Sequence, residues 1–474
     1  MLLLGAMLTS LAACGGDSED SGDKGSSGDK SETAPAGIEA TNYNLPFRIY
    51  APADDTMYSR YYFTDDAGTD VMSKAIYERE ILVEEHLGVD IDYTLTGDLR
   101  DVKTTMQNMV MTGEDTYQLV LTHCISGLSA MIVEDLLYDF NDFEYVDMTN
   151  EWWNQQAREA LSVNGYTFYT VSDYMLPDVN CVLVNKSLLE EFSLENPYDL
   201  VRDGTWTIDK MMEMMSAVTT DNGDGRWNVE DQYGLGCPDD FFLNAFIYAF
   251  DVSLIEKDNE GNLEFAFDNE RAFTMVEKID QLLMNGDAWV YKYTLQPTDE
   301  ESLAVSKGRT LFNIESMGEL YKYRDTEVDY GILPYPKLEA AQEAYQTNAW
   351  SGMMSVPKTV KNSEMVGKVI ELLSYYSQTT TVPAYFDLVL GEKLARDTDS
   401  KEMLGIIFDG VVYDAGASYF GFDSNMNQLF YTPHALIING VGATGFSSHL
   451  AQYQPAAEAT IEEFNETVNS IVRE

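Results

Sequence analysis

Cysteine and histidine are scarce in this sequence, and their spacing excludes several kinds of site. Four cysteines occur, widely separated and without a Cys-x-x-Cys pair, which predicts neither a disulfide framework nor a zinc site. Cys124, Cys181 and Cys237 are expected to be small core residues, and whether two of them pair stays open. Four histidines occur, and no two of them have the spacing of metal ligands on one helix.

Basic residues and catalytic motifs are lacking as well. Lysine and arginine total 29 against 80 acidic residues, which gives a formal net charge of −51. A field of this sign repels nucleic acid and anionic surfaces, so we expect no nucleic-acid partner. The sequence contains no Gly-x-Ser-x-Gly, phosphate-binding loop or His-Glu-x-x-His motif. We therefore predict that the protein is not an enzyme and requires no cofactor.

Long apolar runs are missing after residue 14. The one apolar run begins at Leu2 and ends in Leu11-Ala12-Ala13-Cys14, which has the form of a bacterial lipobox. The run has about 10 residues where ~20 are needed to span a bilayer, so residues 1–13 are predicted to be a signal peptide. We expect a lipid on Cys14 to anchor the chain at the extracellular face of the cell membrane. The alternative is a cysteine that ends a buried segment. Because no Lys or Arg precedes the run, we expect the natural start upstream.

Small and charged residues follow the lipobox. From Gly15 to Gly37 the chain is almost entirely Gly, Ser, Asp, Glu and Lys, a composition that buries nothing. We predict a lipidated flexible tether over residues 14–41. About 430 residues then remain, and 45% of the whole chain is hydrophobic, enough for two or more domains with sizeable cores.

The body of the chain opens on alternating strands and helices. Strands are expected at Phe47–Ala51, Val89–Thr96 and Tyr117–Thr122, with helices at Val71–Leu87 and Leu99–Thr112 between them. Strand–helix repeats of this length predict parallel strands and an α/β fold. Ligands of open α/β sheets bind beyond the carboxyl ends of the strands, so the segments after Tyr50 and Leu121 are predicted to lie near a site.

One acidic loop, Thr220–Asp231, resembles an EF-hand calcium loop. Its pattern of oxygen-bearing residues, with Gly225 at the sharp turn, suits a hard cation, although position 1 is a threonine rather than an acid. The candidate ligands of a structural Ca²⁺ are Asn222, Asp224, Arg226 through its carbonyl, Asn228 and Asp231. The alternative is a glycine-rich acidic turn that holds no metal.

Short segments spread along the chain share their order and spacing with a known family. They are Leu87–Tyr93, Thr112–Leu121, Asn164–Tyr169, Val182–Leu189, Tyr198–Asp209, Phe312–Glu315, Tyr330–Lys337 and Ser355–Lys358. Together they resemble the extracellular solute-binding proteins of ABC importers, the family that contains maltose-binding protein, in a clostridial-type lipoprotein branch. Gln118 departs from the pattern, because relatives often carry Asp there, and no ligand hydrogen bond is assumed at this position.

The resemblance implies the type II periplasmic-binding-protein fold. This is an α/β fold of two lobes, each with a mixed or mostly parallel sheet flanked by helices, joined by hinge crossovers. Lobe 1 would hold residues 42–172 and 355–415, and lobe 2 residues 176–350 and 416–474. Hinges would lie near Asp173–Asn180 and Trp350–Met354.

The resemblance also implies a function. It predicts a monomeric receptor that closes on a carbohydrate, expected to be an oligosaccharide, and passes it to the transmembrane subunits of an ABC permease. The alternatives are a tethered extracellular carbohydrate-active enzyme, and a sensor or adhesion ectodomain on the same fold.

Aromatic and polar side chains near the expected cleft are the candidate ligand contacts. Sugar rings stack on aromatic faces, and their hydroxyls bond to carboxylates and amides. The candidates are Tyr58, Tyr61 and Tyr62 after the first strand, Trp350 at a hinge, and Thr122, His123, Asn180 and Glu315 among the polar residues. For each aromatic the alternative is ordinary packing, which is the expectation for Trp152, Trp153 and Trp289.

Overall fold

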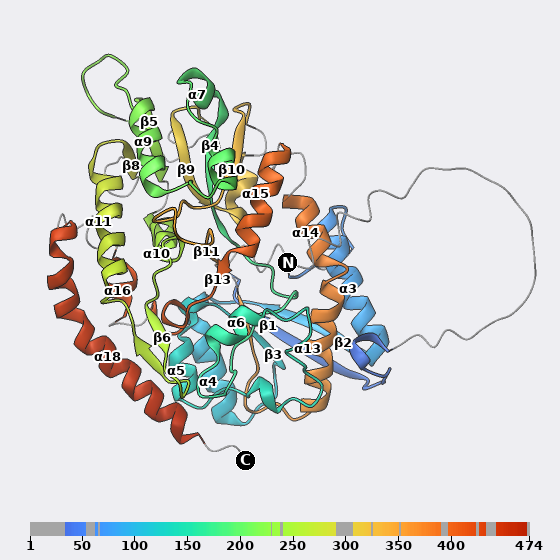
Figure 1. Cartoon of the computed structure of the whole chain (residues 1–474). Coiled ribbons are helices and arrows are strands. Elements are labelled where there is room, and N and C mark those ends of the chain that lie inside the picture. The colour runs from blue at the N-terminus through green and yellow to red at the C-terminus, as the bar shows by residue number, and fades with distance from the viewer. Residues whose placement is uncertain are drawn as a thin grey trace, which may run out of the picture.

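Two β-sheets with helices packed on their faces divide the chain into two lobes (Figure 1). The computed structural model describes residues 34–53, 62–64, 67–228, 230–237, 240–290, 307–323, 326–349, 352–389, 397–422, 426–432 and 442–471. None of the helices in these ranges combines the length and the apolar character that a bilayer crossing requires.

The first sheet has four strands, in the order β12, β3, β1, β2. Their bounds are Met353–Ser355 for β12, Leu119–Thr122 for β3, Leu45–Ala51 for β1 and Val89–Leu95 for β2. β1 pairs in parallel with β2 and β3, whereas β12 runs antiparallel to β3. The predicted parallel βαβαβ start of the chain is therefore confirmed.

Local signals in the sequence set the ends of α3, the helix between β1 and β2. α3 spans Val71–Leu87 and begins where the Asp70 carboxylate accepts a hydrogen bond from the Ser73 N–H at 2.9 Å. It ends at Gly88, whose φ of 60° is the left-handed conformation that favours glycine. The next helix, α4 (Val102–Thr112), follows a 3₁₀ turn at Leu99–Asp101, so the predicted helix over 99–112 has a tighter first turn.

The second sheet has five strands, in the order β10, β4, β9, β5, β8. Their bounds are Tyr330–Leu333 for β10, Asn180–Asn185 for β4, Thr310–Ser316 for β9, Tyr233–Cys237 for β5 and Ala288–Val290 for β8. β4 is antiparallel to both of its neighbours, and β5 is parallel to both of its own, so the sheet is mixed. Two short pairs complete the strands: the antiparallel hairpin β6 (Ile255–Lys257) with β7 (Leu263–Phe265), and β11 (Thr347–Asn348) parallel to β13 (Val411–Val412).

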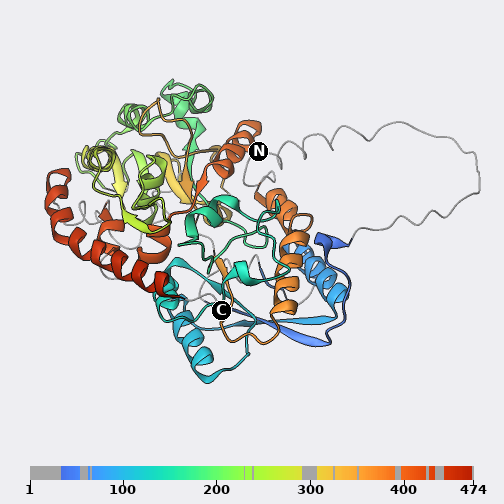
Figure 2. The ribbon, with the colours of Figure 1, turned by 60° about the horizontal axis from the view of Figure 1, so that its bottom comes forward.

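Helices cover the sheets and join the lobes. The other helices of the described ranges are α5 (Leu128–Val133), α6 (Gln155–Leu161), α7 (Lys186–Glu191), α8 (Pro197–Arg202), α9 (Ile208–Val218), α10 (Ala245–Ala249), α11 (Glu270–Met284), α13 (Ser363–Ser377), α14 (Thr381–Val389), α15 (Thr398–Asp409), α16 (Asn427–Phe430) and α18 (Phe446–Ser470). α3 packs beside α13 and α14, and the long α18 runs along one edge of the molecule, where it contacts both α5 and β7 (Figures 1 and 2).

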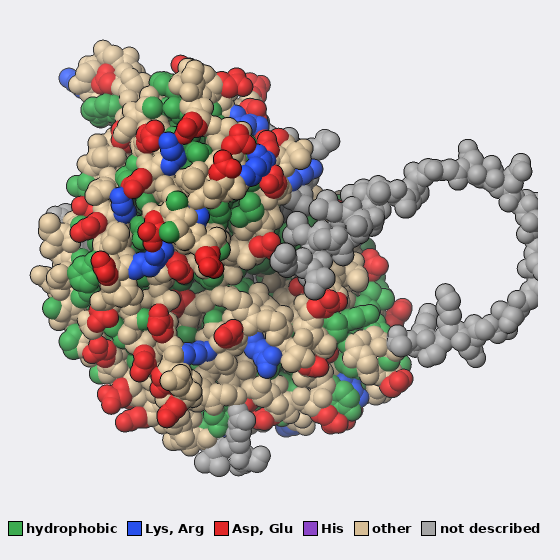
Figure 3. Space-filling view, viewed as in Figure 1, with side chains coloured by type: hydrophobic (Ala, Val, Ile, Leu, Met, Phe, Trp, Pro, Cys, Tyr) green, Lys and Arg blue, Asp and Glu red, His purple; other side chains and the backbone are tan. Residues whose placement is uncertain are grey.

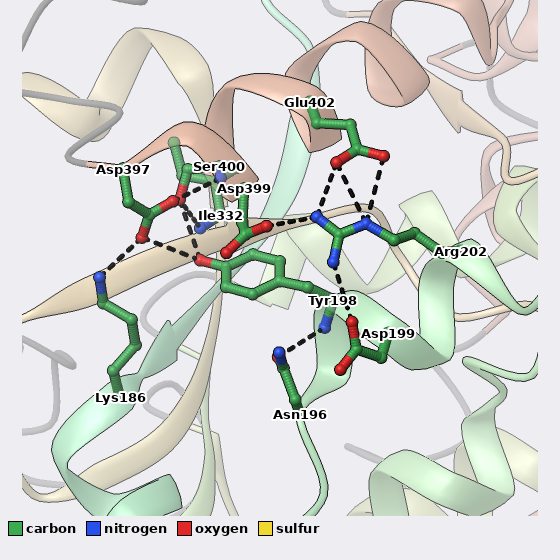
Figure 4. A network of polar contacts seen from close by, with 10 residues as sticks. All are labelled: Lys186, Asn196, Tyr198, Asp199, Arg202, Ile332, Asp397, Asp399, Ser400 and Glu402. Carbon is green, nitrogen blue, oxygen red and sulfur yellow. Dashed lines mark hydrogen bonds and ion pairs between the residues drawn. The ribbon is translucent and has the colours of Figure 1, made fainter.

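Helix α15 belongs with the second sheet, although its residues fall in the range that we assigned to lobe 1. It packs against β10, and Ser400 Oγ in its first turn accepts the backbone N–H of Ile332 at 3.1 Å. Figure 4 shows the polar network that fixes it. Lys186 Nζ lies 2.7 Å from Asp397 Oδ2, and Tyr198 Oη lies 3.0 Å from Ser400 Oγ. The chain therefore crosses to the second lobe before position 415.

The folded body begins earlier than the predicted end of the tether. A 3₁₀ turn at Pro35–Gly37 packs on α13, and the Ile38 side chain is only 2% exposed. The N–H of Thr41 donates to the carbonyl of His86 at 3.0 Å. Because Ile38 gains by burial, residues 35–41 join lobe 1 instead of the tether. Residues 1–33, with the predicted signal peptide and Cys14, lie outside the described residues.

Candidate functional site

The segments that cross between the lobes are hydrogen-bonded to one another. Asn180, the first residue of β4, donates from Nδ2 to Asn348 Oδ1 at 2.9 Å, and its carbonyl accepts the Thr347 hydroxyl at 3.2 Å. On the other lobe, Thr122 at the carboxyl end of β3 donates its hydroxyl to the carbonyl of Met353 at 3.0 Å. The strand ends of both sheets therefore meet at one junction.

A small cavity lies at this junction, and we call it the hinge cavity. Its volume is about 20 Å³, room for about one ordered water. The end of β3, helix α10, strands β11 and β13 and the turn after β13 all contribute to its lining. Among the lining residues are His123, Cys124, Tyr248, Asn348, Tyr413 and Asp414.

His123 brings a neutral imidazole to the hinge cavity. Its Nδ1 accepts the N–H of Ile125 at 3.4 Å and lies 3.3 Å from Cys124 Sγ. Burial lowers the pKa of His123 to about 4, so the ring carries no charge near neutral pH. It can therefore offer a dipolar contact to a ligand, and it offers no positive charge.

A larger cavity of about 460 Å³ adjoins the hinge cavity, and we call it the interlobe cavity. This volume falls in the range of small-molecule sites. Helix α6 of the first lobe forms one wall, and the segment from Tyr248 through Lys257 of the second lobe forms another. The two cavities share four residues, Tyr248, Val412, Tyr413 and Asp414, so the hinge cavity adjoins the inner wall of the larger one.

Hydrogen bonds hold the walls of the interlobe cavity together. The N–H of Tyr413 donates to Gln156 Oε1 of α6 at 2.9 Å. Lys257 Nζ on β6 donates to the carbonyl of Glu159 and, at 3.3 Å, to Ser162 Oγ. These bonds join α6 and Ser162, the residue after it, to segments that follow by more than 90 residues. The shape of the cavity therefore depends on the relative position of the lobes.

Asp414 lies where the two cavities meet. Its Oδ2 accepts the N–H of Leu254 at 3.3 Å, and its Oδ1 accepts the N–H of Ala417 at 3.1 Å. Burial raises the pKa of Asp414 to about 6, and the backbone N–H groups oppose that shift. The carboxyl group is thus fixed in place by backbone donors from both sides.

The structure places the predicted site residues in different surroundings. Thr122, His123 and Asn180 lie at the junction, and of these three His123 lines the hinge cavity. Glu315, on β9, is 3% exposed and accepts the Tyr323 hydroxyl at 2.7 Å, so it lies in the core and lines neither cavity. Tyr62 is buried as well: it is 1% exposed, and its hydroxyl donates to the Leu176 carbonyl at 2.7 Å. The ligand contacts predicted for Glu315 and Tyr62 stay predictions. Tyr58, Tyr61 and Trp350 lie outside the described residues.

Sequence reasoning missed the residues that form most of the cavity walls. Tyr248 lies in a short, wholly buried helix, where nothing distinguishes it from a core residue. Tyr413 and Asp414 follow the short strand β13. Their position directly after a strand is the one signal that could have indicated them.

The acidic loop closes on its own backbone. Asp221 Oδ1 accepts the N–H groups of Gly223 at 2.6 Å and Gly225 at 3.1 Å. Asp231 accepts those of Asn222 at 2.9 Å and Asn228 at 2.6 Å. Within the described part of the chain, which omits Val229, no cluster of three acidic, His or Cys side chains is arranged to hold a metal. The turn without metal accounts for these contacts, and calcium binding stays a prediction.

We expect the Asp221→Ala substitution to lower the free energy of unfolding by about 1 kcal/mol, because two backbone donors lose their acceptor. The loss should be equal in calcium and in chelator, as measured by urea unfolding. Asp224→Ala is the matched control, since Asp224 Oδ1 accepts only the N–H of Arg226. A melting temperature of the parent protein that rises with calcium would contradict the metal-free turn.

Comparison with solved structures finds a likeness over most of the chain. The sugar-binding protein MalE from Xanthomonas citri has a TM-score of 0.59 and 15% identity, covering 90% of this chain and 97% of that one. The GacH receptor of Streptomyces glaucescens, solved unliganded and with acarbose, has a TM-score of 0.54 and 13% identity, covering 90% and 99%. A cyclo/maltodextrin-binding protein complexed with maltotetraose has a TM-score of 0.56 and 13% identity, covering 94% and 100%.

These comparisons establish the fold. No protein-family model matches the chain, and no curated protein does. The solved neighbours are type II periplasmic binding proteins, and the two sheets flanked by helices agree with them. The chain therefore has the type II periplasmic-binding-protein fold that the sequence predicts.

Proposed function

We propose that this protein is a non-enzymatic receptor for a carbohydrate, expected to be an oligosaccharide, which it binds between its two lobes. The observation that carries the proposal is the interlobe cavity of about 460 Å³ in a fold shared with sugar-binding proteins. Its walls combine carboxylates, amides and tyrosines, the groups that hydroxyl-rich ligands require. In this proposal the receptor is a monomer of the solute-binding family, in its lipoprotein branch, and serves an ABC permease.

A thermal-shift screen against mono- and oligosaccharides tests this function. A ligand present at 100 times its dissociation constant should add about 2.7 kcal/mol to the free energy of unfolding. Each sugar that raises the melting temperature is then incubated with the protein and analysed by chromatography. Unchanged sugar supports a receptor, whereas cleaved sugar supports the carbohydrate-active enzyme. A screen with no stabilising sugar would contradict carbohydrate binding.

We further propose that a lipid on Cys14 holds the protein at the extracellular face of the cell membrane. On the face that Figure 3 shows, acidic side chains are spread over both lobes, and a surface of this charge gives little attraction to anionic lipid. The lipid would then be the anchor, without help from surface charge.

The Cys14→Ser substitution should therefore move most of the protein from the membrane fraction to the soluble fraction. Cell fractionation followed by a high-salt wash measures this, with Ser10→Ala as a control that leaves the modified cysteine in place. Persistence of the Cys14→Ser variant in washed membranes would contradict the anchor.

A further inference from the structure

Tyr248 in α10 carries a buried hydroxyl without a partner. The residue is 3% exposed, and its Oη makes no hydrogen bond to any described residue. Buried tyrosine hydroxyls normally find a partner, because an unpaired polar group loses its bonds to water and gains nothing. The hydroxyl of Tyr248 therefore requires an explanation.

Other buried tyrosines in the molecule follow the normal pattern. The hydroxyl of Tyr169 donates to the Leu128 carbonyl at 3.0 Å, and that of Tyr335 donates to the Phe242 carbonyl at 3.1 Å. The hydroxyl of Tyr385 donates to the Pro177 carbonyl at 2.9 Å. Tyr248 differs from these three in its position, because it lines both the hinge cavity and the interlobe cavity.

The electrostatic surroundings keep the Tyr248 hydroxyl protonated. Burial raises its pKa well above the usual value, and the negative charge of Asp414 raises it further. A protonated phenol can donate one hydrogen bond and accept others. The hydroxyl is thus a buried donor, unbonded to any described residue, on a side chain that lines both cavities.

The walls of the interlobe cavity carry an excess of negative charge. Among the described residues that line it, four carry carboxylates, Glu159, Asp251, Glu256 and Asp414, and one is basic, Lys257. The ammonium group of Lys257 is already bonded to the Glu159 carbonyl and to Ser162 Oγ. A cavity lined in this way disfavours an anionic ligand, because like charges repel one another.

We propose that the Tyr248 hydroxyl is a hydrogen-bond partner of the bound ligand at the inner end of the interlobe cavity, and that the acidic walls restrict the ligand to a hydroxyl-rich compound without an anionic group. This inference rests on the proposed carbohydrate binding and names the class of carbohydrate. Neutral oligosaccharides belong to this class, and glycans that carry uronate or phosphate do not.

The Tyr248→Phe substitution tests the role of the hydroxyl. It keeps the ring and removes only the unpartnered group, so the melting temperature of the ligand-free protein should not fall. The dissociation constant should rise about tenfold, the loss expected for one hydrogen bond. Tyr169→Phe is the matched control: it removes a bonded hydroxyl, so it should lower the melting temperature and leave the dissociation constant unchanged.

The probe is whichever of maltotetraose, cellotetraose and mannotetraose stabilises the parent protein most, measured by calorimetry. Its counterpart with one C6 hydroxymethyl oxidised to a carboxylate should bind at least tenfold more weakly, and added salt should reduce that difference. Equal binding of both forms would overturn the charge restriction. Equal binding of the probe to the parent and to Tyr248→Phe would overturn the role of the hydroxyl, and a lower melting temperature for that variant would indicate a structural water instead.

The outcomes separate this inference from the proposed function. If none of the three neutral probes binds the parent protein, carbohydrate binding fails and the inference fails with it. If a probe binds the parent and the Tyr248→Phe variant alike, carbohydrate binding stands and the role of the hydroxyl is overturned. If the neutral and the oxidised probe bind the parent alike, carbohydrate binding stands and the charge restriction is overturned.

Discussion

Replacing Glu371 by leucine should lower the free energy of unfolding by about 3 kcal/mol or more. Glu371 lies on α13 and is 1% exposed, and its two carboxylate oxygens accept four N–H groups from a distant segment of the same lobe. The donors are Asn150 Nδ2 at 2.9 Å, Trp152 Nε1 at 3.0 Å, Trp153 Nε1 at 2.9 Å and the backbone N–H of Asp147 at 3.3 Å. Leucine would leave these buried donors unpaired, at a cost of about 1–3 kcal/mol for each one that water cannot reach.

Urea unfolding of the purified protein measures this loss. Glu371→Gln is the more conservative variant, and it should also destabilise, because one oxygen becomes an NH₂ group that faces N–H donors. Glu364→Gln, a half-exposed position on the same helix that pairs with Lys368 and accepts the Tyr43 hydroxyl, is the control and should lower the urea midpoint much less. A midpoint for Glu371→Leu equal to that of the parent would show that α13 is held by its apolar face alone.

The same carboxyl group should make stability depend on pH. Burial raises the pKa of Glu371 from 4.5 to about 7, and its four donors oppose this shift without cancelling it. Because the folded pKa lies above the unfolded one, the stabilising contribution is complete below pH 4.5 and is lost as the pH rises through about 7. The Glu371→Gln variant has no titrating group at this position. The difference in free energy of unfolding between the parent and this variant should therefore narrow between pH 5 and pH 8. A difference that stays constant would contradict the raised pKa.

Local features of the fold could be predicted from the sequence, because their causes are local. Helix α3 has the predicted bounds, since Asp70 supplies an N-cap and Gly88 supplies a left-handed stop within the same few residues. Burial of Trp152 and Trp153 was expected and is confirmed. Their shared partner Glu371 lies more than 200 residues away, and no pattern in the sequence connects the three.

The candidate site could be predicted only in part for the same reason. Thr122 and His123 could be placed because they follow a recognisable strand in a parallel sheet. The interlobe cavity brings together α6, the end of α10 and the residues after β13, which are separated by long stretches of chain. Tyr248 and Asp414 became neighbours through packing of segments that lie far apart in the chain, a property that composition and periodicity do not encode.

The crossing segments suggest a second large effect, at Gly410. This glycine follows α15 and precedes β13, and a Cβ atom added to it would lie 2.0 Å from the carbonyl oxygen of Tyr345. Its own carbonyl accepts the N–H of Thr347 at 3.0 Å, so the two backbones cannot separate without breaking the start of β11. Its φ of −94° suits any residue, and the constraint is therefore the close approach of the two chains.

We expect the Gly410→Ala substitution to lower the free energy of unfolding by about 3 kcal/mol, the upper end of the range for inserting one methyl group into a packed region. Gly113→Ala is the matched control, because Gly113 has a φ of 68° and nothing lies within 4 Å of its added Cβ. That variant should lose only about 1 kcal/mol, the cost of a left-handed alanine. Urea unfolding of both variants separates the effect of the close backbone contact from the effect of an unfavourable φ.

Since β11 and β13 also line the hinge cavity, Gly410→Ala should weaken sugar binding and Gly113→Ala should not. If Gly410→Ala lowered the free energy of unfolding no more than Gly113→Ala, the backbones of Gly410 and Tyr345 could move apart at little cost. The crossing segments would then hold the lobes less tightly than these contacts imply.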